Sequence, residues 1–287
     1  MNRRRLLQLL GGASVVAIAG CASKSANSGA QSTSTSPTTA TAASDASSTT
    51  DVIPEETAGP FPGDGSNGVN VLAEDGVVRR DIRSSFGSAS GAADGVPMTI
   101  RFDLGDAATG AALASAAVYV WHCDREGRYS RYSEGATDQN YLRGVQAADA
   151  DGLVTFTSIY PACYSGRWPH IHFEVYPSVD DATASSNLLA TSQIALTENV
   201  CDTVYATDGY EQSRTNMTQV SLASDMVFSD GVDLETPTVT GSVADGYVVT
   251  LPVTVASCWS TPSRKTMSLV SDVCCMLRTL ALYPSVA

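Results

Sequence analysis

Hydrophobic and polar residues alternate in several short windows along the chain. Because successive side chains of a β-strand point to opposite faces, this alternation predicts half-buried strands. Gly-Asp and Asp-Gly pairs, which favour tight turns, lie between the windows, and no long helical pattern separates them. Strands are therefore expected at residues 99–104, 117–121, 154–157, 171–175 and 247–251.

Strands of this length and spacing favour an all-β fold, an antiparallel β-sandwich or barrel, built from residues 51–256. No internal repeat of fixed period is found in the chain. Residues 257–287 form a C-terminal tail whose role the sequence does not indicate, although residues 267–282 have the spacing of a short amphipathic helix.

The N-terminus has the features of an export signal. Arginines at positions 3–5 precede a short apolar stretch at residues 6–19, which is typical of a signal peptide over residues 1–20. The string Ile18-Ala19-Gly20-Cys21 resembles the lipobox of bacterial lipoproteins, and this resemblance implies a lipid anchor on Cys21. An ordinary cleaved secretory signal is the alternative, and the sequence leaves both the Sec and the twin-arginine routes open.

The segment after the signal is expected to be a linker. More than half of the positions in residues 22–50 are Ser or Thr. Such a segment buries too little apolar surface to offset its ordering entropy, so residues 21–50 are expected to form a flexible tether. No apolar run reaches the roughly 18–20 residues of a membrane helix. The expected location is therefore outside the cytoplasmic membrane, held by the lipid alone or secreted.

Composition and charge exclude several classes of protein. Of the 287 residues, 43% are hydrophobic and 16% charged, which supplies a core and excludes collagen-like or wholly disordered chains. The formal net charge of −13 argues against nucleic acid as a partner, since phosphate backbones select basic surfaces.

Two of the three histidines lie in one predicted strand. His170 and His172 are two residues apart, so their side chains project from the same face, together with Glu174. The apolar side chains between them would face the core. Two imidazoles on one strand face can bind a metal ion, although a histidine pair without a metal is the alternative.

Tyrosines and an arginine surround this pair in a recognisable order. The quoted segments are Trp121-His122-Cys123-Asp124, Gly127-Arg128-Tyr129, Pro161-Ala162-Cys163-Tyr164 and Arg167-Trp168-Pro169-His170-Ile171-His172. Together they closely resemble the motifs of the intradiol ring-cleavage dioxygenases, which act on catechol and protocatechuate. The resemblance runs from about residue 56 to residue 251. The segment 57–61 also resembles the family's pocket lining, which implies that Gly59, Pro60 and Phe61 contact the substrate.

The resemblance implies one non-haem Fe(III) per chain, held by Tyr129, Tyr164, His170 and His172. Two anionic phenolates favour ferric iron, unlike the two-histidine, one-carboxylate set of Fe(II) oxygenases. The family pattern further implies that Tyr164 leaves the metal as a base when the substrate binds.

The same resemblance implies roles for Arg167 and Gln193. Arg167 would stabilise negative charge developing on the ring, and Gln193 would help it orient the substrate. The implied reaction joins a small aromatic diol with O₂ to give a cis,cis-muconate-type diacid outside the membrane. Which catechol derivative is used, and the oligomeric state, are left open by the sequence.

The cysteines and two departures from the family pattern give further expectations. With Cys21 assigned to lipid, the remaining six are Cys123, Cys163, Cys201, Cys258, Cys274 and Cys275. Export permits disulfides, and a Cys123–Cys201 bridge is the first expectation. Ala162-Cys163 replaces the common Pro-Gly pattern, and Trp168 is expected to narrow the pocket mouth.

Two other functions are compatible with parts of the sequence. A cupin-like enzyme would bind a different metal through His122, His170, His172 and Glu174. A non-catalytic cell-surface binding module with an Ig-like sandwich would explain the export features, with the motif as a relic. Tyr132 and Tyr160 are expected to lie outside the metal site.

Overall fold

The structure is a computed structural model and describes residues 51–256. The predictions for the signal, for Cys21 and the tether, and for the C-terminal tail fall outside these residues. Within the described part, no helix is long and apolar enough to cross a membrane. The elements, in chain order, are β1 (Pro97–Asp106), β2 (Ala117–Trp121), β3 (Arg143–Ala147), β4 (Leu153–Ile159), β5 (His170–Tyr176), η1 (Ser185–Asn187), β6 (Ala190–Ala195), α1 (Glu198–Tyr205), α2 (Glu211–Met217), η2 (Leu222–Ser224), η3 (Phe228–Asp230), β7 (Thr238–Ser242) and β8 (Gly246–Val255).

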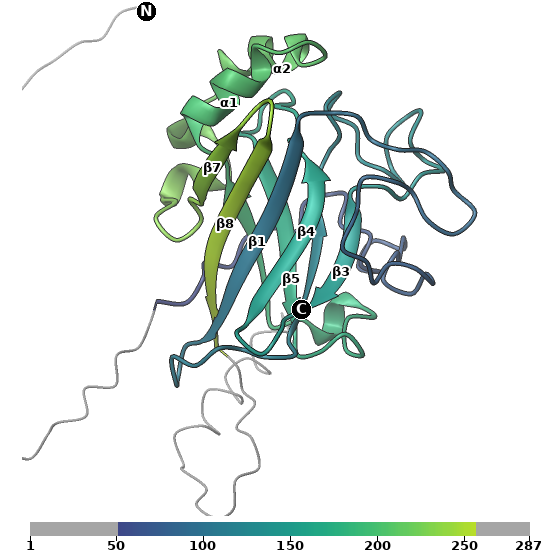
Figure 1. Cartoon of the computed structure of the whole chain (residues 1–287), viewed down its shortest axis with the longest axis vertical. Helices are drawn as coiled ribbons and strands as arrows, with labels where there is room; N and C mark the ends of the chain where they lie inside the picture. The colour runs from purple at the N-terminus through teal and green to yellow at the C-terminus, as the bar shows by residue number, and fades with distance from the viewer. Residues whose placement is uncertain (1–50, 257–287) are drawn as a thin grey trace, which may run out of the picture. The chain divides into compact units, whose positions relative to one another are not determined.

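The strands form two four-stranded sheets, as the sequence predicts for an all-β sandwich. One sheet has the order β4-β1-β8-β7 and the other β3-β2-β5-β6 (Figure 1). All five predicted strands are present. One pair departs from the expected antiparallel pattern, because β1 and β8, which are far apart in sequence, pair in parallel.

The hydrophobic core lies between the sheets. On β1 the side chains of Met98, Ile100, Phe102 and Leu104 are buried in alternation. They meet the apolar face of β5, where the Phe102 and Phe173 ring centroids are 5.0 Å apart. Burial of each such large side chain contributes about 1.5–3 kcal/mol, so the period-two pattern directly specifies which face of each strand is inside.

The opposite face of the second sheet is also covered. All seven residues of β5 are buried. A second apolar cluster, which includes Val71, Tyr119, Trp121 and Tyr129, covers this face with loops from residues 58–86 and 123–132. The face that carries the two histidines is therefore enclosed between a sheet and its loops.

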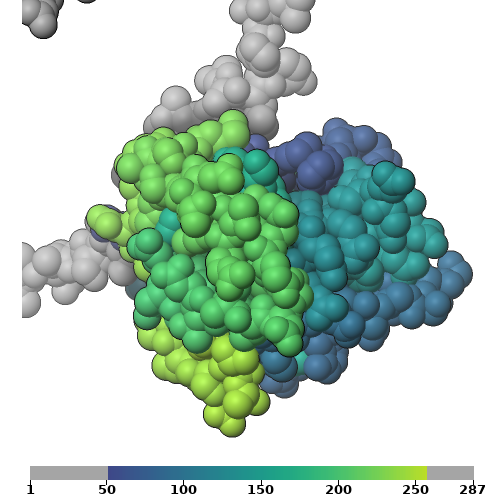
Figure 2. Space-filling view, turned by 90° about the horizontal axis from the view of Figure 1, so that it is seen from above, coloured from purple at the N-terminus to yellow at the C-terminus, as the bar shows by residue number. Residues whose placement is uncertain are grey.

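Elements without alternating hydrophobicity were not predicted. Strand β3 contains Gly144, where an added Cβ would lie 2.6 Å from the Ile82 side chain, so close packing there excludes a larger residue. Strand β7 is mostly exposed. Helices α1 and α2 are eight and seven residues long, too short for a clear helical period. Figure 2 shows this green helical segment lying against the blue and teal segments that precede it in the chain.

The expected Cys123–Cys201 disulfide is wrong. Within the described residues 51–256, both cysteines are free and buried. Cys123 belongs to the cluster beneath the loops, and its thiol points to the carbonyl oxygen of Ala162. Cys201 lies in the inter-sheet core, where its sulfur is 3.2 Å from the Tyr160 hydroxyl. The two thiols therefore belong to different apolar clusters.

Candidate metal centre

Strand β5 presents His170 and His172 on the same face. Their Nε2 atoms are 3.1 Å apart, and their rings meet edge to face. Both residues are buried. The alternation of a strand is enough to bring these two nitrogens together, because the intervening Ile171 points into the core.

Two loops bring Tyr129 and Tyr164 to the histidine pair. The Tyr129 hydroxyl lies 3.4 Å from Nε2 of His170, and the Tyr164 hydroxyl lies 3.2 Å from the same atom. The loops approach each other closely at Gly127, which has φ +84° and where an added Cβ would lie 3.2 Å from that of Tyr164. The structure therefore gathers the four expected metal ligands around one point.

The loop before Tyr129 is held by a buried carboxylate. Asp124 accepts hydrogen bonds from the backbone N–H groups of Glu126 and Arg128, at 3.0 and 2.9 Å, and from the Tyr141 hydroxyl at 2.9 Å. The sequence motif that links Asp124 to Tyr129 thus has a local cause, since the aspartate fixes the turn that aims the tyrosine.

Hydrogen bonding and burial prepare the imidazoles as ligands. Nδ1 of His170 is 2.5 Å from the carbonyl oxygen of Trp168, so it carries the proton and leaves the Nε2 lone pair facing the other donors. The His172 ring stacks on Trp121, with 4.9 Å between centroids and 3° between planes. Burial lowers the pKa of His170 to about 3 and lowers that of His172 well below its ordinary value. Both rings are therefore neutral.

The tyrosines are phenols unless a cation is present. Burial raises the pKa of Tyr164 to about 12, and it raises the pKa of Tyr129 well above its ordinary value. A bound cation would reverse this preference by stabilising the phenolates.

The donor set fits a single metal ion. Three donor atoms surround Nε2 of His170 at 3.1–3.4 Å. Ligands that share one ion at about 2 Å are roughly 3 Å apart. Among residues 51–256 no three His, Cys, Asp or Glu side chains converge on a common point, so two tyrosines are essential to this set.

A polar chain lies beside the four donors. Arg167 donates from Nη2 to Oε1 of Gln193 at 2.8 Å and from Nε to Oδ2 of Asp225 at 2.9 Å. Gln193 is paired with His172 in the register of β5 and β6. Its Nε2 donates to the carbonyl oxygen of Thr57 at 2.8 Å. This bond connects the row of polar side chains to the pocket segment, residues 57–61.

The pocket segment lies against the four donor side chains. An added Cβ on Gly59, which has φ +69°, would lie 3.4 Å from Cε1 of His172. The Phe61 ring is 5.0 Å from the Tyr129 ring. The intervening Pro60 is exposed, and its carbonyl oxygen accepts a hydrogen bond from Asn67 at 3.0 Å. Gly59 and Phe61 thus lie beside the four donors, whereas Pro60 is exposed.

Other residues considered from the sequence lie elsewhere. His122 points toward the opposite sheet, with Nε2 at 2.7 Å from the Ser158 hydroxyl, and the Glu174 carboxylate accepts a hydrogen bond from Tyr176 at 2.6 Å. The ligand set of the cupin-like alternative is therefore not assembled. The Tyr132 hydroxyl bonds to Gly63 and Asn67.

The expectation for Trp168 is wrong. Its side chain is buried in a cluster with Ala195, Val227 and Phe228, and its Nε1 donates to the carbonyl oxygen of Leu196 at 2.8 Å. The indole packs behind the site because its N–H is satisfied there, and it does not line the mouth.

Sequence reasoning missed two residues that organise the site. Asp225 holds Arg167, and the buried Arg143 donates to the carbonyl oxygens of Phe61 at 2.8 Å and Pro62 at 2.7 Å. A lone arginine in a strand usually faces solvent, so no local signal in the sequence marks Arg143 as part of the site. Asp225 belongs to no motif, since its partner is 58 residues away.

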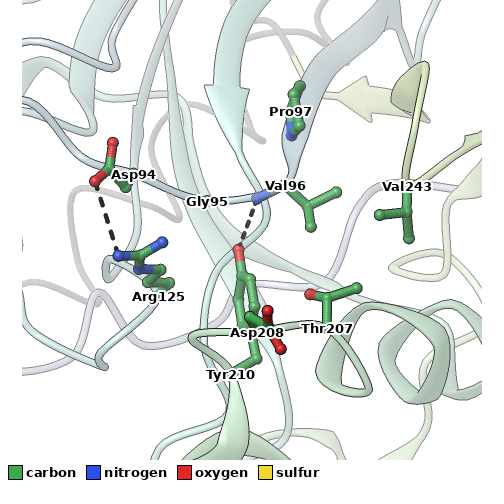
Figure 3. Close-up of a pocket in the computed structure, with 9 residues that line it drawn as sticks. All are labelled: Asp94, Gly95, Val96, Pro97, Arg125, Thr207, Asp208, Tyr210 and Val243. Atoms are coloured by element: carbon green, nitrogen blue, oxygen red, sulfur yellow. Dashed lines mark hydrogen bonds and ion pairs between the residues drawn. The ribbon is translucent and has the colours of Figure 1, made fainter.

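A separate surface hollow of about 460 Å³ lies away from the four donors. It is lined by residues that include Asp94, Arg125 and Tyr210 (Figure 3). The Tyr210 hydroxyl accepts a hydrogen bond from the backbone N–H of Val96 at 3.1 Å and donates to the carbonyl oxygen of Tyr160 at 2.7 Å. The hydroxyl is thereby committed to joining α2 to the sandwich.

Comparison with known proteins finds chains of similar sequence and fold. Residues 83–180 match a family model described as Dioxygenase. An intradiol ring-cleavage dioxygenase from Tetranychus urticae is 22% identical, with a TM-score of 0.59 over 74% of this chain and 98% of that one. A dioxygenase designated Tetur07g02040 gives 22% and 0.58 over 74% and 97%. The dioxygenase domain of a carbohydrate-binding fusion protein from Streptomyces sp. SirexAA-E gives 19% and 0.46 over 72% and 99%.

The family match and the sandwich fold define a dioxygenase, an oxidoreductase. The fold is that of the intradiol ring-cleavage dioxygenases, and the matched residues 83–180 support cleavage of a catechol-type ring in general.

Proposed function

We propose that this protein is a non-haem Fe(III) dioxygenase that cleaves a catechol-type diol with O₂ to a cis,cis-muconate-type diacid. The observation that carries the proposal is the convergence of two phenols and two imidazoles, with Nε2 of His170 at 3.1–3.4 Å from the other three donor atoms.

The residues that would hold the iron are Tyr129, Tyr164, His170 and His172. The two hard, anionic oxygen donors favour ferric over ferrous iron. When bound, Fe(III) supplies a Lewis acid that binds the deprotonated diol and makes its ring reactive toward O₂.

The two tyrosines differ in their freedom to move. Tyr129 is only 2% exposed and packs against Phe61, whereas Tyr164 is partly exposed. Tyr164 is therefore the better candidate for the base, since its hydroxyl oxygen can turn away and accept a proton from the incoming diol. Tyr129 would keep its position throughout.

Arg167 and Gln193 would bind and orient the ring. The guanidinium is held by two hydrogen bonds and keeps a positive charge in a largely dry pocket. Such a fixed charge stabilises negative charge that develops on the substrate. Gly59 and Phe61 would form the wall that excludes water from this side.

We also propose that the enzyme acts outside the cytoplasmic membrane. The N-terminal arginines, the apolar stretch, the string ending at Cys21 and the Ser/Thr-rich segment support this location. Fractionation of cells that express the full chain or its Cys21→Ser variant tests it. Membrane-bound wild type and a released variant are expected, and a cytoplasmic wild-type protein would contradict the proposal.

The activity is tested with the purified full chain loaded with iron. Red-brown colour from tyrosinate-to-iron charge transfer, one iron per chain and a ring-opened diacid from catechol are the expected results. Protocatechuate, hydroxyquinol and chlorinated catechols complete the substrate panel. A colourless iron-loaded protein would reject the ligand set. No turnover of any diol, with Tyr164→Phe indistinguishable from wild type, would favour the binding-module alternative.

A further inference from the structure

Asp225 is a fully buried carboxylate beside the site. Its Oδ2 accepts hydrogen bonds from Nε of Arg167 at 2.9 Å and from the backbone N–H of Trp168 at 2.6 Å. Its Oδ1 accepts from the backbone N–H groups of Val227 at 2.9 Å and Phe228 at 3.2 Å. Both oxygens thus face donors only, which an ionised carboxylate satisfies and an amide does not.

The charge of Asp225 agrees with these contacts. Burial acts to raise its pKa, but the hydrogen bonds from Arg167 and from the backbone N–H groups of Trp168 and Val227 outweigh burial and leave the pKa below its ordinary value. The loop that begins η3 is thereby joined to the loop that precedes β5, with the ion pair between them.

The contacts of Arg167 leave one side of its guanidinium available. Nε is bonded to Asp225 and Nη2 to Gln193. Within residues 51–256 no hydrogen bond is found for Nη1. The side chain is 11% exposed, and the Phe228 ring lies 5.7 Å from the guanidinium carbon. The guanidinium plane is therefore fixed on two edges, and Nη1 is the nitrogen left for a substrate.

We propose that Asp225 is a positioning residue that fixes the orientation of Arg167 so that Nη1 faces the bound diol. This inference rests on the role of Arg167 in the proposed function. Asp225 also balances the charge of Arg167, so the free site has little net attraction for a carboxylate on the ring. The pocket is consequently expected to favour diols without an acidic substituent.

The first test is a double-mutant cycle in the iron-loaded full chain. Asp225→Asn removes the charge and turns one acceptor into a donor, so kcat for catechol is expected to fall about tenfold or more. The iron content should not change, because none of the four metal ligands bonds to Asp225. The Arg167→Ala/Asp225→Asn variant should be no slower than Arg167→Ala, because Asp225 acts through Arg167. Multiplied losses in the double variant, or unchanged kcat in Asp225→Asn, would overturn the proposal.

The control is Asp230→Asn, which removes the same charge from an exposed position on η3. It is expected to leave kcat for catechol close to that of wild type. A selectivity measurement separates positioning from a general loss of structure. In Asp225→Asn the ratio of kcat/KM for protocatechuate to that for catechol should rise, because Arg167 is no longer balanced. A ratio equal to that of wild type would count against the charge-balancing role.

A nitrogen NMR spectrum of the full chain tests the pairing without turnover. The Arg167 Nε–H resonance is expected to exchange slowly with water in wild type and in Asp230→Asn, and rapidly in Asp225→Asn. If wild type does not cleave any diol, the proposed function fails while this spectrum still tests the pair. A rapidly exchanging wild-type resonance would refute the pairing itself.

Discussion

The two facing imidazole nitrogens are the centre of the site at the scale of single residues. Nε2 of His170 carries no proton, since Nδ1 keeps the proton and donates it in a hydrogen bond to the Trp168 carbonyl oxygen. Among residues 51–256, no hydrogen-bond partner is found for the buried Nδ1 of His172. Without a metal, a proton must lie between the two Nε2 atoms or their lone pairs repel. A metal ion would take the place of that proton and would also accept the two phenolates.

The two tyrosines at positions 129 and 132 provide a matched pair for testing the ligand set. Tyr129→Phe is expected to reduce iron retention and to change the visible absorption, because it removes a phenolate from the centre. Tyr132→Phe should change neither, since its hydroxyl bonds to Gly63 and Asn67. Metal analysis and absorption spectra of both variants, purified in parallel, make the comparison. Equal iron content and equal spectra would show that Tyr129 is not a ligand.

A substitution at Arg167 is expected to lower turnover without changing metal binding. Arg167→Ala is expected to retain iron and colour, because the arginine side chain bonds to Asp225 and Gln193 rather than to the four donors, and to lose about 10²–10³ in kcat. The change would reflect lost stabilisation of charge in the transition state. Steady-state kinetics and metal content of the same preparation test this. Turnover at the wild-type rate would remove Arg167 from the mechanism.

At the scale of elements, Arg143 connects β3 to the pocket segment. It is buried, and its guanidinium donates to the carbonyl oxygens of Phe61, Pro62 and Ser130 and to the hydroxyl of Tyr119. A planar guanidinium can satisfy these acceptors together, whereas an ammonium group cannot. The order of the pocket segment therefore depends on an arginine in a neighbouring strand.

Arg143→Lys is expected to loosen the pocket segment while it retains the positive charge. KM for the diol should rise several-fold, with a smaller fall in kcat and unchanged iron content, and the melting temperature should fall. Arg80→Lys, at an exposed position, is the control. Kinetics, metal analysis and thermal unfolding of the two variants provide the measurement. An unchanged KM and melting temperature in Arg143→Lys would contradict the structural role.

The sequence predicted the elements whose pattern is local and missed those whose cause is distant. Alternation identifies β1, β2, β4, β5 and β8 because each buries one apolar face against the same core. It also puts His170 and His172 on one face. That Tyr129 and Tyr164 join the two histidines could be predicted only from the family resemblance. Strand β3 and Asp225 were missed because their partners are distant in the chain. Gly144 of β3 packs against Ile82, and Asp225 accepts a hydrogen bond from Arg167.

At the scale of the whole molecule, the many acidic residues include two glutamates, Glu56 and Glu235, whose backbones pair with the outer edge of β6. Thr191 accepts a backbone hydrogen bond from Glu56 at 2.8 Å, and Ala195 donates one to the carbonyl oxygen of Glu235 at 3.0 Å. Glu235 is fully buried, and within residues 51–256 the Ser192 hydroxyl is the side-chain group that offsets part of the cost of burying its carboxyl group. A buried carboxyl group with so little support from donors is costly in its ionised form, so the stability of the described domain should depend on pH.

Burial, followed by the neighbouring charges of Glu56 and Asp230, raises the pKa of Glu235 from 4.5 to about 8. The folded protein therefore keeps a proton that the unfolded chain releases above pH 4.5. The stability contributed by this group is fully present below pH 4.5 and decreases as the pH rises toward about 8.

Glu235→Gln keeps the shape without an ionisable group, so it should raise the melting temperature at pH 8, and this gain should shrink toward pH 4.5. Thermal unfolding from pH 4.5 to 8.5, with the exposed Glu134→Gln as control, measures the difference. A gain that does not vary with pH would show that Glu235 is ionised in the folded state or that its cost is not electrostatic.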